Sequence, residues 1–320
     1  MIEGLVIQHG ANRYLVQASC EDGGEIRACT IAGRLLQGRQ LKVRVAVIGD
    51  RVRFKEEASS KGQHGVIQEI LPRENQISRP APSGGRRQYQ EQVVIANLDR
   101  LWVIASLAEP ALNLMFVDRI FAAARHQGVD CGLVLNKADL KEAADPGPVR
   151  ALYASLGLPV QLCSALKDQG IEELREALSR GIGAFVGLSG VGKSSLITAL
   201  EPGLKLRTSQ VTEKSGQGRH TTSTSRLFPL SHGGYLADTP GMREFGLWGM
   251  ARPDLSACFV EFAAHEGECR FRDCLHDHEP GCAVRAAVER DELDAGRYRR
   301  YLGLLEELPA SLSDWRDRRN

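Results

Sequence analysis

The sequence predicts three domains: an amino-terminal β-barrel of the OB type, a central α/β domain with a mostly parallel sheet, and a mostly α-helical carboxy-terminal domain. Short strand-like segments divided by turn residues fill the first seventy residues. Strand-like and helix-like segments then alternate, and a cysteine and histidine cluster follows them. We expect the boundaries at 1–80, 81–248 and 249–320.

The expected barrel strands are apolar or alternating runs, separated by glycine-containing turns. They are Tyr14–Val16, Ile26–Cys29, Leu41–Val45, Arg51–Phe54 and Gly65–Ile67. Five short strands in this length suit a small OB barrel. Alternation along two of them places four cations on one face, namely Lys42, Arg44, Arg51 and Arg53. That face can follow an RNA phosphate backbone or simply be solvated, and charge alone leaves both readings open.

A linker rich in glycine and proline, Arg79 to Arg87, separates the barrel from the centre. In the centre we expect strands near 93, 103, 133, 161, 185 and 236. Helix-like segments alternate with them at Leu112–His126, Ile171–Ser179 and Ser195–Leu200. Such alternation predicts a mostly parallel sheet flanked by helices.

A phosphate-binding loop follows the strand-like run Ala184 to Val186. Its residues are Gly187-Leu188-Ser189-Gly190-Val191-Gly192-Lys193-Ser194, with Ser195 opening a helix. Glycines let successive backbone N–H groups turn toward phosphate oxygens. We expect Lys193 to reach the β- and γ-phosphates and Ser194 to bind Mg²⁺.

A guanine-recognition motif, Asn136-Lys137-Ala138-Asp139, follows another strand-like run. The Asp139 carboxylate can accept hydrogen bonds from guanine N1–H and N2–H₂, a donor pair that adenine lacks, so GTP is favoured over ATP. The Lys137 stem can lie across the base, and Asn136 can brace the phosphate loop or contact the base. Ser164-Ala165 is placed to back the guanine ring.

The order of the motifs is unusual. A third motif, Asp238-Thr239-Pro240-Gly241, supplies a carboxylate for Mg²⁺ and a Gly241 N–H for the γ-phosphate. Most GTPases run phosphate loop, switch and then guanine motif, whereas here the guanine motif comes first, so the domain is circularly permuted. The third motif therefore leads directly toward the carboxy-terminal domain, which makes the GTPase a candidate lever between its two neighbours.

The polar segment 214–224 lies between the phosphate loop and Asp238. It reads either as a disordered surface loop or as a switch in which Thr221 or Thr222 binds Mg²⁺ beside the γ-phosphate. Met242 stands where many GTPases carry a water-orienting glutamine, and a thioether cannot do that. We therefore expect His220 or a partner to position the water.

Three thiols and one imidazole lie within residues 269–282: Cys269, Cys274, His276 and Cys282. This set suits one structural Zn²⁺ with all four positions taken by protein. Disulfides are the rival explanation, and His278 is an alternative ligand. Because a nucleotide-binding enzyme is expected in the reducing cytoplasm, a metal site is favoured over disulfides. Helices are expected at Ala283–Glu292 and Arg297–Glu307.

Composition agrees with a soluble, multi-domain protein. The chain has 320 residues, of which 42% are hydrophobic, and a formal net charge of +1. No apolar run is long enough to span a membrane, and no polybasic tail is present. We expect a cytoplasmic protein with no membrane or DNA partner.

These motifs and their order resemble the ribosome-small-subunit-dependent GTPase A family of circularly permuted bacterial GTPases. The resemblance covers nearly the whole chain and includes Gly218-Arg219-His220-Thr221-Thr222. It implies binding to the small (30S) ribosomal subunit and its 16S rRNA late in subunit maturation, GTP hydrolysis stimulated by the subunit, and release afterwards. It also implies that His220 helps position water. From the motifs we further expect GTP or GDP, Mg²⁺ and one Zn²⁺ to be bound, and we expect a monomer.

Two rival functions remain at this stage. In the first, the protein is a non-enzymatic RNA-binding scaffold with nucleotide as a structural ligand; Met242 favours this, and Lys193 and Asp238 oppose it. In the second, it is a P-loop kinase or ATPase, which Asp139 opposes.

Overall fold

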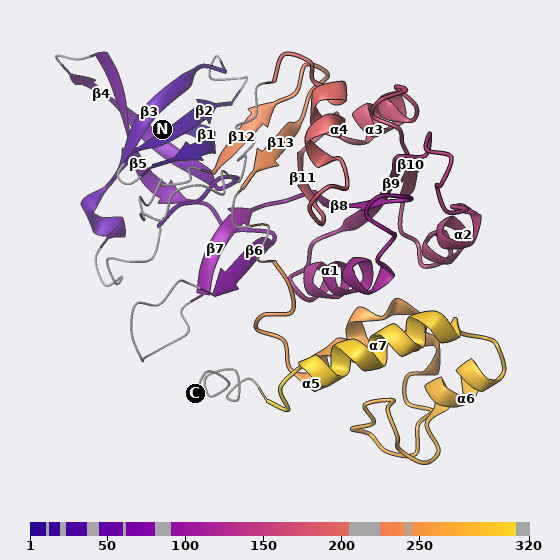
Figure 1. Ribbon diagram of the computed structural model, residues 1–320. Coiled ribbons are helices and arrows are strands. Elements are labelled where there is room, and N and C mark those ends of the chain that lie inside the picture. Colours follow the sequence, from indigo (N-terminus) through magenta and orange to yellow (C-terminus); the bar gives the residue numbers. More distant parts are fainter. Residues whose placement is uncertain are drawn as a thin grey trace, which may run out of the picture.

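A computed structural model describes residues 1–10, 13–19, 24–36, 45–59, 62–80, 91–204, 225–239, 242 and 245–311 (Figure 1). Figure 1 shows the barrel at one end of a long sheet and the carboxy-terminal module beneath helix α1. Among the helices of these ranges, none combines the length and the apolar character needed to cross a membrane.

The amino-terminal barrel is closed by hydrogen bonding between its first and fourth strands. Its strands are β1 (Ile2–His9), β2 (Tyr14–Ala18), β3 (Ile26–Ile31), β4 (Arg51–Ser59) and β5 (Gly62–Ile70). They are ordered β1-β2-β3-β5-β4, and the β1–β4 pairing completes the ring. The OB-type barrel is thereby confirmed. Strand β1 was not anticipated from the sequence, and most of the expected strand Leu41–Val45 lies outside the described residues.

A hairpin of β6 (Gln76–Pro80) and β7 (Glu91–Ala96) links the barrel to the central sheet. Ile48 forms a parallel bridge with Ile95, and both side chains are fully buried. The hairpin therefore packs against the barrel as well as leading into the centre.

The central sheet has the order β10-β9-β8-β11-β13-β12, and all neighbours are parallel except β12 and β13. Its strands are β8 (Arg100–Ser106), β9 (Cys131–Asn136), β10 (Val160–Leu162), β11 (Ile182–Val186), β12 (Arg226–Pro229) and β13 (Tyr235–Asp238). Its helices are α1 (Leu114–His126), α2 (Gly147–Ser155), α3 (Ile171–Ala177) and α4 (Lys193–Leu200). The predicted parallel sheet with flanking helices is confirmed, but the strand expected near residue 93 is β7, which pairs with β6 in a separate two-stranded sheet and is not part of the central one.

Alternation along β8 builds a core on each face of this sheet. Leu101 and Val103 join the cluster that contains α1, whereas Trp102 and Ile104 join the cluster that contains α3 and α4. Successive side chains of a strand point to opposite faces, so a strand covered on both sides must be apolar throughout. The sheet is therefore a rigid platform for the loops at its edges.

The barrel continues the central sheet. Strand β1 pairs antiparallel with β12 at Gln8 and Arg226. Beside this contact the Tyr235 hydroxyl donates a hydrogen bond to Gln17 Oε1 at 3.0 Å. Because β12 directly follows residues 205–224, the expected switch segment runs into the strand that carries the barrel.

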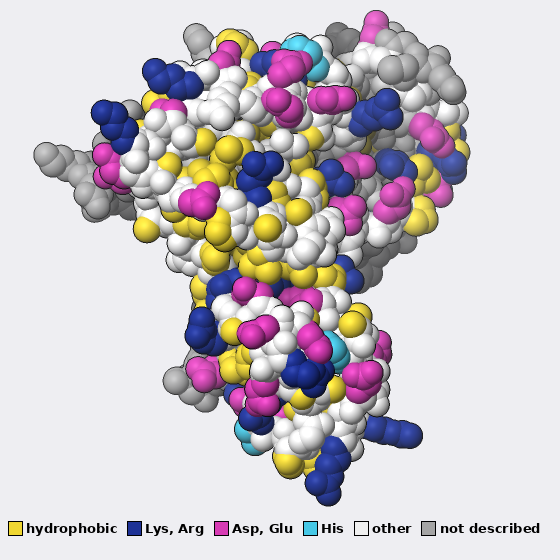
Figure 2. Space-filling view, turned by 90° about the vertical axis from the view of Figure 1, so that its right-hand side faces the viewer, with side chains coloured by type: hydrophobic (Ala, Val, Ile, Leu, Met, Phe, Trp, Pro, Cys, Tyr) yellow, Lys and Arg dark blue, Asp and Glu magenta, His cyan; other side chains and the backbone are white. Residues whose placement is uncertain are grey.

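The carboxy-terminal module is a separate, mostly helical lobe (Figure 2). It contains α5 (Arg252–Leu255), the 3₁₀ turns η4 (Ser256–Cys258) and η5 (Val260–His265), α6 (Ala283–Glu289) and α7 (Ala295–Glu307). The rings of Phe259 and Phe262 pack edge-on against Tyr301, with centroid separations of 5.0 and 4.9 Å. Figure 2 shows acidic and basic side chains mixed over this lobe.

A buried carboxylate on α1 joins this lobe to the central domain. Asp118, which is 1% exposed, accepts hydrogen bonds from Tyr153 Oη at 2.7 Å and Arg300 Nε at 2.5 Å, and from Arg297 Nη1. Arg297 also pairs with Glu261, and its guanidinium lies 4.6 Å from the Phe259 ring centroid. Buried charges are tolerated where they are paired and hydrogen-bonded, so each partner here depends on the others.

We predict that Asp118→Ala destabilises the protein by about 3–5 kcal/mol, because it removes one of the two carboxylates that pair with the buried Arg297 and the carboxylate that pairs with Arg300. The matched control is Arg119→Ala on the same helix, which removes a more exposed pair with Glu307 and is expected to cost no more than about 1 kcal/mol. Urea unfolding measures both, and equal midpoints for the two variants would contradict the prediction.

Candidate functional site

The candidate nucleotide site lies at the carboxyl edge of the parallel sheet. The guanine motif begins at the last residue of β9, the phosphate loop follows β11, and Asp238 ends β13. Strand β8 lies between β9 and β11. Ligands of open parallel sheets bind at this edge, where loops from neighbouring strands converge.

The phosphate loop joins β11 to the first turn of α4. Gly190 and Gly192 have φ angles of +82° and +95°, a region open to glycine and strained for other residues. Lys193 Nζ donates to the carbonyls of Gly187 and Leu188, both at 2.7 Å. The ammonium group is therefore held over the loop, and Ser194 and Ser195 are exposed at the start of α4.

Asn136 connects the guanine motif to the phosphate loop. Its side chain is 1% exposed, and Nδ2 donates to the Val191 carbonyl at 2.9 Å. A Cβ atom on Gly192 would stand 2.3 Å from this Nδ2, so the amide fills the space that a side chain there would need. The sequence left two roles open for Asn136, a contact with the phosphate loop or a contact with the base. The structure shows the contact with the phosphate loop.

Asp139 lies against the loop that was expected to back the guanine ring. Ser164 Oγ donates to Asp139 Oδ1 at 2.5 Å, and the Lys167 N–H donates to Ser164 Oγ at 3.1 Å. The Ala138 N–H also bonds to the Cys163 carbonyl at 3.1 Å. These contacts hold one carboxylate oxygen in place and bring Ser164-Ala165 beside the guanine motif.

The third motif is described only in part. Asp238 closes β13, beside β11, and Thr239 is buried. Met242 is 5% exposed and belongs to the large core cluster, so its side chain cannot orient a water molecule at the site. The predicted site residues His220, Thr221, Thr222 and Gly241 lie outside the described residues.

The candidate metal centre brings together all four expected ligands. The ligand atoms of Cys269, Cys274, His276 and Cys282 lie within 4.8 Å of one another. The Ala283 N–H points to Cys269 Sγ at 3.3 Å, and the Arg285 N–H to Cys282 Sγ at 3.5 Å. Sulfur atoms that accept backbone hydrogen bonds suit thiolates, so the donor set fits a tetrahedral zinc ion.

Neighbouring groups hold the metal-binding loop. Glu279 accepts from the Leu275 and Asp277 N–H groups at 2.7 and 3.0 Å, and Tyr298 Oη donates to the His276 carbonyl at 2.7 Å. Burial lowers the pKa of His276, which favours the neutral imidazole that binds metals. His278, the alternative ligand, pairs with Asp277 and its side chain is 86% exposed.

The expected cationic face of the barrel is neutralised where it is described. Arg51 pairs with Glu74 at 2.8 Å, and Arg53 pairs with Glu3 and Glu69 at 2.9 and 3.1 Å. The remaining two members, Lys42 and Arg44, lie outside the described residues. The described part of this face therefore favours a solvated surface over one that follows an RNA phosphate backbone.

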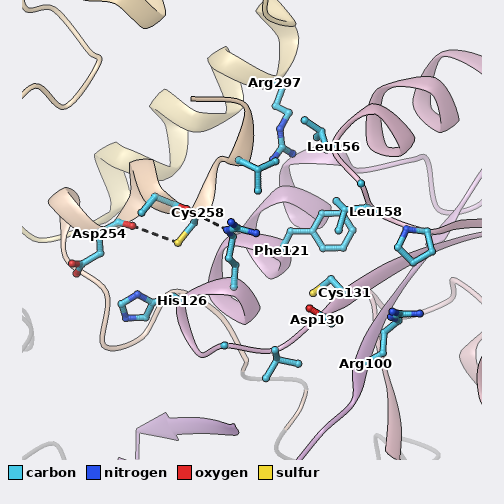
Figure 3. A pocket seen from close by; sticks show the side chains of 17 residues that line it. Arg100, Phe121, His126, Asp130, Cys131, Leu156, Leu158, Asp254, Cys258 and Arg297 are labelled. Atoms are coloured by element: carbon cyan, nitrogen blue, oxygen red, sulfur yellow. Dashed lines mark hydrogen bonds between the residues drawn. The ribbon is translucent and has the colours of Figure 1, made fainter. Parts of the chain in front are cut away.

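A cavity of about 670 Å³ opens between α1 and the carboxy-terminal module (Figure 3). Phe121, Leu158 and Arg297 are among the residues that line it. Arg100 and Cys131, which also line it, begin β8 and β9. The cavity is therefore at the amino edge of the sheet, opposite the phosphate loop.

Comparisons with known proteins agree with this arrangement. Residues 70–248 match the family model described as RsgA GTPase. The small ribosomal subunit biogenesis GTPase RsgA of Gemmatimonas aurantiaca is 41% identical over 308 residues, covering 95% of this chain and 97% of that protein. Its counterpart from Azotobacter vinelandii is 41% identical, covering 96% and 85%.

Two solved structures are similar over almost the whole chain. YjeQ from Thermotoga maritima superposes with a TM-score of 0.77 at 32% identity, covering 96% of this chain and 98% of that one. YloQ, described as a circularly permuted GTPase, has a TM-score of 0.75 at 25% identity, covering 98% and 96%.

We predict that Asn136→Ala weakens guanine-nucleotide binding about tenfold, because the phosphate loop loses its buried brace. Titration with a fluorescent GDP analogue measures this. Asn75→Ala is the matched control, since that amide also joins two loops, through Leu98, but at the other edge of the sheet. Equal affinities for the wild type and Asn136→Ala would contradict the prediction.

We further predict that purified protein carries zinc and that Cys274→Ser loses most of it, because a hydroxyl is a poor replacement for a thiolate ligand. Cys258→Ser, which changes a buried thiol of the same module outside the cluster, is expected to keep the metal. The zinc content of the wild type, Cys274→Ser and Cys258→Ser, measured by metal analysis, tests this prediction. Zinc retained by Cys274→Ser at the wild-type level would rule out the assignment.

Proposed function

Because the chain belongs to the RsgA GTPase family, we propose that it binds the small ribosomal subunit late in maturation and hydrolyses GTP to GDP and phosphate when the subunit stimulates it. Hydrolysis then releases the protein from the subunit. The observation that carries this proposal is the Asn136–Val191 hydrogen bond, which makes the guanine motif and the phosphate loop one site. The names of the relatives supply the ribosomal partner.

Each half of the nucleotide site has a proposed role. Asp139 selects guanine, with Ser164-Ala165 holding it in place and Lys137 covering the base. The backbone from Gly187 to Ser195 surrounds the phosphates, and Lys193 moves from the loop carbonyls to phosphate oxygens. Release from two carbonyls to an anion is favourable for an ammonium group.

We assign Ser194, Asp238 and one switch threonine, Thr221 or Thr222, to magnesium, with Thr222 preferred. Mg²⁺ bound there would neutralise charge on the β- and γ-phosphates. The buried position of Met242 supports a water-positioning role for His220, aided or replaced by a group of the subunit. The Gly241 N–H is assigned to the γ-phosphate.

The three domains have separate proposed roles. Residues 1–80 contact 16S rRNA through a surface other than the paired Arg51 and Arg53. Residues 249–320, built on one structural zinc ion, also face 16S rRNA, and residues 81–248 form the GTPase. The chain after Asp238 can transmit a movement of the third motif to the carboxy-terminal module. Its residues Phe245, Leu247 and Met250 belong to the same core cluster as Phe259 and Tyr301 of that module. A shift of the third motif on loss of the γ-phosphate would reach that module directly. The protein acts as a cytoplasmic monomer.

We predict that 30S subunits stimulate GTP hydrolysis at least tenfold, whereas 50S subunits and buffer do not, because the subunit completes a site that Met242 leaves unfinished. Lys193→Ala and His220→Ala are each expected to abolish most of the stimulated rate. Release of phosphate measured at steady state decides between a GTPase and a nucleotide-binding scaffold. Equal slow rates under all three conditions would refute subunit stimulation.

A further inference from the structure

Residues 107–110, which directly follow β8, lie beside both halves of the candidate nucleotide site. It begins at the guanine motif, where the Leu107 N–H donates to the Asn136 carbonyl at 3.0 Å. The Leu107 carbonyl accepts from the Ala144 N–H at 2.8 Å, and the Leu107 side chain is 2% exposed. The segment is thus firmly anchored at its first residue.

Its other end lies against the phosphate loop. Pro110 Cδ is 3.5 Å from the position that a Cβ atom on Gly190 would occupy. The proline ring fixes its own φ, and Pro110 directly follows the Glu109 carbonyl group in the chain. The Glu109 carbonyl is therefore held in a defined direction between the two motifs.

Lys137 of the guanine motif donates from Nζ to this Glu109 carbonyl. Its backbone has a φ angle of +64°, and its side chain spans the gap between the guanine motif and the segment. A lysine stem is apolar along its length and covers flat surfaces well when its ammonium group has a partner. The tether gives Lys137 such a partner before any ligand arrives.

We propose that Glu109 and Pro110 form a wall of the nucleotide site that holds Lys137 extended, ready to cover one face of the guanine ring. The inference rests on the proposed guanine-nucleotide site and adds a positioning role that none of the motifs contains. Ordering a free lysine side chain costs conformational entropy, and a side chain ordered in advance removes that cost from binding. Pro110 and Glu109 act through Lys137 and not through the phosphate loop.

The first test is Pro110→Gly, which frees the Glu109 carbonyl without removing any motif residue. We expect about threefold to tenfold weaker binding of a fluorescent GDP analogue, the range of one hydrogen bond. Pro159→Gly is the matched control, because Pro159 precedes β10 at the amino edge of the sheet and should leave affinity unchanged. Unchanged affinity in Pro110→Gly would overturn the proposal.

The second test separates positioning from a general loosening of the site. Lys137→Met keeps an apolar side chain but loses the tether, so it should weaken binding about as much as Pro110→Gly, and Lys137→Ala should weaken it more. In the Lys137→Met background, Pro110→Gly should have no further effect. Fully additive losses would assign the effect of Pro110 to its contact with Gly190 and overturn the proposal.

The outcomes also distinguish failure of the proposed nucleotide site from failure of the positioning role of Glu109 and Pro110. A wild-type protein that fails to bind the GDP analogue would refute the nucleotide site and this role together. A wild-type protein that binds it, with Pro110→Gly equal to wild type, would refute this role alone. Thermal melting of each variant shows whether it is folded, and Lys137→Met tests the tether even where Pro110→Gly does not fold.

Discussion

The hydrogen bond from the buried Asn136 amide to the Val191 carbonyl is the constraint on which the rest of the site depends. It joins the loop after β9 to the loop after β11, with β8 between the two strands. The bond requires that the two strands end close together at the same edge of the sheet, and it does not depend on the order in which the chain forms them. A permuted GTPase can therefore keep the geometry of its nucleotide site while its termini lead elsewhere.

The circular permutation decides which elements are joined through the chain to the candidate nucleotide site. The strand that pairs with the barrel, β12, follows residues 205–224. The chain after Asp238 enters the core that it shares with the carboxy-terminal module. Asp118 then fastens that module to α1 through Arg297 and Arg300. The module is thus held at a buried ion-pair network and connected to the nucleotide site through one continuous stretch of chain.

Local patterns in the sequence were sufficient to predict the phosphate loop, the guanine motif and the metal cluster, because each is a short run of residues whose chemistry requires fixed spacing. The alternation of strands and helices likewise predicted the parallel sheet. The spacing of Ser164-Ala165 after Asp139 suggested the loop that lies beside the guanine motif. Buried strands such as Cys131–Asn136 are apolar up to their last residue and easy to recognise.

Contacts between distant residues could not be predicted in the same way. Strand β1 was not predicted, and nothing local in the sequence indicates that it pairs with β12. Asp118 looks like an ordinary helical aspartate until α7 supplies two arginines 179 and 182 positions later. The Glu109 carbonyl carries no side-chain signal, so its bond to Lys137 is visible only in three dimensions.

The most direct test of the central claim, that the two motifs form one guanine-nucleotide site, is a crystal structure with GDP and Mg²⁺. We expect the base on Asp139, the Lys137 stem across the ring, the phosphates in the loop from Gly187 to Ser194, and Lys193 released from the Gly187 and Leu188 carbonyls. Nucleotide bound elsewhere, for example in the cavity beside Arg297, or Asp139 turned away from the base, would contradict it.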